Sequence, residues 1–162
     1  MSASIRASAI AILLTLACPA WAAQPNPAAQ RILPASPSDA AVALEGFHAA
    51  LRRGDAKAAL AFVADDAIVF EEGRAERSKA EYALRHAEAD AAFSKAVPSK
   101  LLSRIGHATA DLALIASESR TKGRFNGQDV DRIMVESMVL RRQGGAWKIV
   151  HIHWSSAQPS TE

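Results

Sequence analysis

The stretch Trp147–Ser156, WKIVHIHWSS, lies near the end of the chain and is rich in β-branched and aromatic side chains. This composition predicts a β-strand, in which successive side chains point to opposite faces. His151 and His153 are therefore expected on the same face as Trp147 and Ile149. Two imidazoles on an apolar face indicate either the wall of a ligand pocket or a mixed core in which each ring is hydrogen-bonded.

The preceding segment is joined to this strand by Gly144-Gly145, a two-residue connection typical of a tight β-hairpin. The register of such a hairpin places Met138 opposite His151 and Glu136 opposite His153. Neighbours of this kind have Cβ atoms about 5 Å apart, so a carboxylate and a methionine should join the histidines. The other face is expected to be buried against a second subunit, and it carries Val135, Ser137, Val139, Val150, Ile152 and Trp154.

Helical patterns precede the strand-like ones. A first helix is predicted from Ser36 to Gly54, a short second helix follows the capping residue Asp55, and a capping box opens a third helix over 78–97. Apart from an early strand at 67–73, the strand-like segments all follow the third helix. This order predicts an α+β fold with the helices packed on one side of an antiparallel sheet.

The inner stripe of the third predicted helix carries polar groups. Steps of three and four residues from Tyr82 reach His86 and then Asp90, so both should lie on the buried side. A carboxylate one turn from an imidazole can fix one ring nitrogen and leave the other free as a base or ligand. A local polar contact within the helix is the alternative.

The N-terminal residues have the pattern of an export signal. Arg6 is followed by a short apolar run and by the small-x-small site Ala20–Ala22, which predicts a signal peptide over residues 1–22. A proline-rich linker is expected at 23–35, the domain at 36–157 and a short tail at 158–162. Cleavage would remove the single cysteine, Cys18, and would leave a periplasmic or secreted protein without a membrane attachment. Lipid modification of Cys18 is the alternative.

Charge and composition exclude some classes of function. The chain is 49% hydrophobic and 22% charged, which is typical of a globular protein with a real core. Its 19 Lys plus Arg and 17 Asp plus Glu are nearly balanced and scattered, so no basic surface for nucleic acid is expected. The sequence contains no glycine-rich phosphate loop and no nucleophile elbow.

The order of the predicted elements resembles the nuclear transport factor 2-like superfamily, in its SnoaL-like branch. The resemblance rests on RGDAKAALAFVADDAIVFEEG, ERSKAEYALRHAEAD, ESMVLRR and GGAWKIVHIHWSS. It implies a cone in which a strongly bent antiparallel sheet wraps around three N-terminal helices, encloses a pocket and dimerises through its outer face. The superfamily includes ketosteroid isomerases, polyketide cyclases, dehydratases and non-catalytic domains, so the fold does not select a chemistry.

The candidate site residues follow from these patterns. The candidate catalytic groups are His86, His151 or His153 as a general base and Glu136 as its orienter or acid. The candidate pocket-lining residues are Tyr82, Asp90, Met138, Ser117 and Glu71. The leading hypothesis is an exported homodimer that binds an unidentified small molecule without a cofactor. The alternatives are an enzyme using histidine acid/base chemistry on a cyclic or carbonyl substrate, a histidine-rich site for zinc, copper or iron, and an assembly domain with a filled interior.

Overall fold

The computed structural model describes residues 39–160, so the predicted signal peptide, linker and first helical turn lie outside the described residues. Helix α1, Asp39–Arg53, buries Ala40, Leu44, Phe47, Ala50 and Leu51 at spacings of three and four residues. The helix ends at Gly54, whose φ of 75° favours glycine. Helix α2, Ala56–Leu60, is capped by Asp55, which accepts a hydrogen bond from the backbone N–H of Ala58. The predictions for these two ends are confirmed.

The third predicted helix is two helices, α3 (Lys79–Arg85) and α4 (Ala87–Ala96). They meet at His86, whose φ of −129° and ψ of −32° are not helical. The chain therefore has four helices over residues 39–160, and the prediction of three was wrong. Neither glycine nor proline marks the break. The side chain of His86 instead lies 2.5 Å from the buried carboxylate of Glu76, a contact between distant residues that sequence periodicity does not report.

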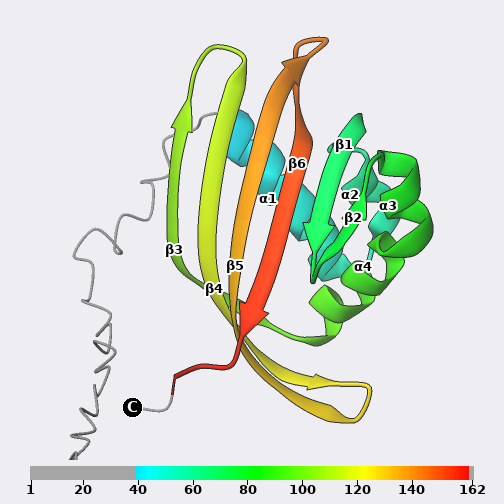
Figure 1. Ribbon diagram of the computed structural model, residues 1–162, viewed down its shortest axis with the longest axis vertical. Coiled ribbons are helices and arrows are strands. Elements are labelled where there is room, and N and C mark those ends of the chain that lie inside the picture. Colours follow the sequence, from blue (N-terminus) through cyan, green and yellow to red (C-terminus); the bar gives the residue numbers. More distant parts are fainter. Residues whose placement is uncertain (1–38, 161–162) are drawn as a thin grey trace, which may run out of the picture.

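Six strands form one curved, open sheet in the order β2-β1-β6-β5-β4-β3 (Figure 1). Their bounds are β1 Val63–Glu71, β2 Arg74–Glu76, β3 Ser99–Ala108, β4 Leu112–Phe125, β5 Gln128–Gln143 and β6 Ala146–Ala157. Strand β1 pairs with β6 in parallel and all other pairs are antiparallel, so the sheet is mixed rather than wholly antiparallel. The α+β class and the cone-like wrapping of the sheet around the helices are confirmed.

The closing hairpin has the predicted turn but only part of the predicted register. Gly144 and Gly145 both have positive φ, as a primed two-residue turn requires. The predicted pairing holds from the turn as far as Leu140 opposite Ile149, and Val139 then pairs with His151. One extra residue in β6 forms a β-bulge at this point, and such a shift moves every later side chain to the other face.

The bulge decides which side chains face the helices. Beyond it, Ile152 pairs with Met138 and both are fully buried, while Trp154 pairs with Glu136 on the same concave face. His151 and His153 pair with Val139 and Ser137 on the convex face. The predicted subunit interface was therefore wrong in composition, because Ile152 and Trp154 belong to the interior.

Candidate functional site

A cavity of about 280 Å³ lies between the concave face of the sheet and helices α1 and α4. This volume is close to the lower end of the range for small-molecule sites, about 300–1,000 Å³. Apolar side chains form much of its wall, namely Leu51, Phe93, Val97, Leu101, Met134 and Trp154. The cavity is therefore large enough for a small organic molecule, and the polar and charged groups in its wall decide which one.

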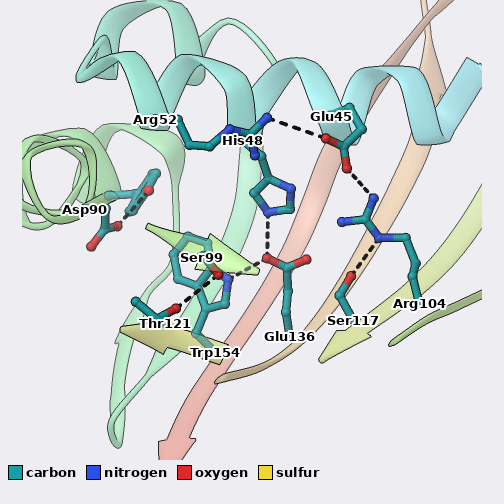
Figure 2. Close-up of polar contacts among 11 residues, drawn as sticks. Glu45, His48, Arg52, Asp90, Ser99, Arg104, Ser117, Thr121, Glu136 and Trp154 are labelled. Carbon is teal, nitrogen blue, oxygen red and sulfur yellow. Dashed lines mark hydrogen bonds and ion pairs between the residues drawn. The ribbon is translucent and has the colours of Figure 1, made fainter. Parts of the chain in front are cut away.

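Glu136 of β5 is the most deeply placed carboxylate of the cavity wall. Its Oε2 accepts hydrogen bonds from His48 Nε2 and from the indole N–H of Trp154, each at 2.8 Å (Figure 2). Burial alone raises the pKa of Glu136, but the neighbouring His48 and the two hydrogen bonds hold the pKa below its usual value. The side chain is 10% exposed, and its Oε1 is buried without a hydrogen-bond partner in the described part of the chain.

A row of charged residues on α1 borders this carboxylate. Glu45, His48 and Arg52 recur at three and four residues and line one side of the cavity. Glu45 forms ion pairs with Arg104 of β3 and, at 3.7 Å, with Arg52. The Nε of Arg104 also donates to Ser117 Oγ at 3.0 Å (Figure 2). The negative charge of Glu45 therefore lies beside two guanidinium groups. The carboxylate of Glu136 lies beside the imidazole of His48.

Two further carboxyl groups line another part of the cavity, those of Glu71 of β1 and Asp90 of α4. Asp90 Oδ2 accepts a hydrogen bond of 2.8 Å from the hydroxyl of the fully buried Tyr82. Burial raises the pKa of Asp90, against the opposing effects of the Tyr82 hydrogen bond and of His86. Burial and the charge of Asp90 raise the pKa of Glu71 to about 7. Glu71 thus takes up or releases a proton near neutral pH.

A buried contact between an imidazole and a carboxylate lies behind these two carboxyl groups. Glu76 of β2 is 1% exposed, and its Oε1 is 2.5 Å from His86 Nδ1. Arg74 donates to the other ring nitrogen of His86 at 3.4 Å. Neither Glu76 nor His86 lines the cavity. His86 therefore touches the site only through its electrostatic effect on Glu71 and Asp90.

The structure separates the residues that the sequence placed together. Of the candidate residues, Glu71, Asp90, Ser117 and Glu136 line the cavity. Tyr82 lies behind Asp90, and His86 pairs with Glu76 rather than with Asp90. Met138 belongs to the packed core.

His151 and His153 were wrongly placed in the cavity. His151 Nδ1 donates to the carbonyl of Ile68 at 3.1 Å, and both histidine rings stand edge-on to Phe70 on the convex face. The predicted group of three imidazoles and Glu136 is therefore not assembled. Within residues 39–160, no group of three histidine, cysteine or acidic side chains is arranged to hold a metal ion.

Sequence reasoning missed His48, Glu45, Arg52 and Arg104. Glu45, His48 and Arg52 each follow directly after a buried residue of α1. They therefore lie along the edge of the buried face of this helix. That spacing was available as a signal that the row borders the interior. Arg104 had no comparable signal, because its inward direction depends on the bulge between Leu101 and Ser103 in β3.

The comparison with known proteins now identifies the family. The sequence pattern of the SnoaL-like domain matches residues 41–159. The chain belongs to this family. Its elements and curved sheet also place it in the nuclear transport factor 2-like superfamily. No curated protein matches the sequence.

Solved structures with the same fold carry different names. A candidate ketosteroid isomerase from Shewanella frigidimarina NCIMB 400 is 35% identical, with a TM-score of 0.70 over 73% of this chain and 95% of that one. A nuclear transport factor 2-like protein of unknown function from Pseudomonas putida KT2440 is 28% identical, with a TM-score of 0.61 over 71% and 82%. The association domain of C. elegans CaMKII is 20% identical, with a TM-score of 0.59 over 72% and 92%, a likeness of fold alone.

No helix in the described part of the chain combines the length and the apolar character needed to cross a bilayer.

Proposed function

We propose that this SnoaL-like domain binds a small organic molecule in the cavity between α1, α4 and the sheet. The observation that carries the proposal is the carboxylate of Glu136, which stands in the cavity wall with one buried oxygen unpartnered among residues 39–160. A buried acceptor without a hydrogen bond costs about 1–3 kcal/mol, and a bound donor group would remove this cost. The open cavity also argues against an assembly domain with a filled interior.

Ligand-observed NMR with a set of neutral, cationic and anionic single-ring compounds tests this proposal. Ser119 lines the cavity and is half-buried, so Ser119→Phe should fill the cavity without removing a core contact. Ser155 pairs with Val135 on the convex face, and Ser155→Phe makes the same change outside the cavity. Binding to the wild type and to Ser155→Phe, with loss in Ser119→Phe, supports the proposal. Equal binding to all three proteins would contradict it.

A second candidate function is acid/base catalysis, centred on Glu71 and Asp90 rather than on the histidines. The observation that favours it is the pKa of about 7 for Glu71, because a general acid or base works best with a pKa near the operating pH. The similarity to a candidate ketosteroid isomerase agrees with proton transfer at carbon. Exchange of an activated C–H proton of a cyclic ketone into D₂O tests this. Wild-type exchange that is lost in Glu71→Gln supports catalysis, and no exchange above buffer contradicts it.

We also propose that two copies of the domain associate through the convex face of the sheet. Large apolar side chains on this side are 40–49% exposed, namely Ile68, Phe70, Ile105, Leu112, Leu114 and Val135. Several large exposed apolar side chains on one face of a sheet are typical of an interface. The likeness to CaMKII association domains shows only that this fold occurs in assembly domains.

Export to the periplasm or the outside of the cell remains our proposal from the sequence of residues 1–22. N-terminal sequencing of the mature protein should give Ala23 or a neighbouring residue. A lipid-modified Cys18 would contradict the proposal.

A further inference from the structure

The charged groups of the cavity wall are unevenly balanced. Four carboxyl groups face two guanidinium groups and one imidazole in the lining. The basic groups are all engaged at the α1 side, where Arg104 and Arg52 pair with Glu45 and where His48 pairs with Glu136. No basic group of the described lining is left for Glu71 and Asp90.

The surroundings of Glu71 and Asp90 confirm this imbalance. Among the described residues, the Glu71 carboxylate makes no hydrogen bond or ion pair, and Asp90 accepts only the hydroxyl of Tyr82. The imidazole of His86 lies against the carboxylate of Glu76. An ionised carboxylate inside a protein needs a positive partner or a proton, because desolvation of the charge is costly. Among the described residues the acidic end of the cavity therefore has no positive partner, and a bound cation can take the place of the proton on Glu71.

Two further features of the wall favour a positively charged ligand. The rings of Phe93 and Trp154 line the same cavity, and the face of an aromatic ring attracts cations. Glu136 Oε1 is an independent acceptor, nine-tenths buried and unpartnered in residues 39–160, which requires an N–H or O–H donor. Ligands that only accept hydrogen bonds would leave this oxygen unsatisfied.

We propose that the cavity binds a small organic cation, a primary or secondary ammonium carried on a single ring or a short aliphatic body. The ammonium lies between Glu71 and Asp90, the apolar body packs on Phe93 and Trp154, and a second donor group of the ligand meets Glu136 Oε1. This inference rests on the proposed ligand-binding function and specifies the chemical class of the ligand.

The competing occupant is a neutral carbonyl compound that accepts a hydrogen bond from protonated Glu71. The two occupants differ in their response to pH. The groups that act on Glu71 are Asp90 of α4, Glu76 of β2, His86 between the helices and Glu72 at the strand end. Glu71 loses its proton as the pH rises through about 7, so a cation binds more tightly at pH 8 than at pH 6. A carbonyl compound binds more weakly at pH 8.

Isothermal titration calorimetry with benzylamine, benzyl alcohol and benzoate tests the inference, because these probes share one ring and differ in charge. We expect benzylamine to bind at least about tenfold more tightly than benzyl alcohol, a difference of about 1.4 kcal/mol. Its affinity should rise from pH 6 to pH 8, where a simple alkylammonium group stays protonated. Benzoate should bind most weakly.

Charge-neutral variants locate the effect. Glu71→Gln and Asp90→Asn should each reduce the preference for the amine over the alcohol toward equality. Glu72→Gln makes the same change on the exposed neighbouring residue outside the cavity and should retain the preference.

The possible failures are distinguishable. Benzyl alcohol could bind as tightly as benzylamine or more tightly, with binding lost in Ser119→Phe. This result would overturn the proposal that the ligand is a cation and would leave the proposed ligand-binding function intact. A preference for benzylamine that survives in both Glu71→Gln and Asp90→Asn would overturn the assignment of these two residues. Binding of none of the three probes at millimolar concentration would count against the ligand-binding function itself.

Discussion

Glu136 and Glu71 are two carboxyl groups of one cavity whose surroundings move their pKa values in opposite directions. His48 and Trp154 keep Glu136 ionised, whereas burial and the charge of Asp90 raise the pKa of Glu71 to about 7. Two carboxyl groups whose pKa values differ can take different roles in one site. The sequence identified both glutamates as candidates. It did not identify His48, the partner of Glu136, because the contact joins α1 to β5 across 88 residues of chain.

Replacing Glu71 by Gln should stabilise the protein at alkaline pH. The folded-state pKa of about 7 is above that of an unfolded glutamate, so the folded state holds this proton more tightly. This contribution to the free energy of unfolding is present below about pH 4.5 and is lost as the pH rises through about 7. We expect Glu71→Gln to raise the Tm relative to the wild type more at pH 8 than at pH 5. An equal change in Tm at both pH values would contradict this account.

At the scale of elements, the two largest departures from the sequence prediction are a bulge and a helix break. The Gly144-Gly145 turn was predicted because it has a local signal, and it is confirmed. The bulge near Val150 has a weak local signal that the prediction did not use, because Ile149 and Val150 are consecutive apolar residues and the alternation changes phase after them. The break at His86 has no glycine or proline, and His86 contacts Glu76, ten residues earlier in the sequence. The uninterrupted alternation assumed from Trp147 to Trp154 therefore placed His151 and His153 on the wrong face.

Opposite effects are expected for the same charge on the two faces of β6. Ile152 is 0% exposed in the core, so Ile152→Glu buries an unpaired carboxylate and should destabilise the fold by at least about 3 kcal/mol. His153 is exposed on the convex face, so His153→Glu should leave the domain folded. Urea denaturation followed by circular dichroism compares the two variants. A cooperatively folded Ile152→Glu protein of wild-type stability would contradict the bulged register.

For the whole molecule, the α+β class followed from the order of the elements and from the family resemblance, and both are confirmed. The full lining of the cavity did not follow, because it depends on the curvature of the sheet and on the bulges that direct Arg104 and Trp154 inward. The exposed apolar residues of the convex face lie on strands other than β6, and this face is where a second copy is proposed to bind.

Leu114→Glu tests this association. Leu114 is 46% exposed on β4, so a charge there should not disturb the core but should disrupt an apolar interface. We expect size-exclusion chromatography with light scattering to give dimers for the wild type and monomers for the variant at micromolar concentration. A monomeric wild type would contradict the proposed dimer.

The most direct test of the central claim is a carboxyl ¹³C NMR titration of glutamate-labelled protein with benzylamine. The signals of Glu71 and Glu136, assigned with Glu71→Gln and Glu136→Gln, report on two parts of the cavity wall. A ligand that occupies the cavity as proposed should shift both signals in a saturable way and leave that of the exposed Glu72 unchanged. Saturable binding that shifts neither Glu71 nor Glu136 would place the ligand elsewhere and contradict the account.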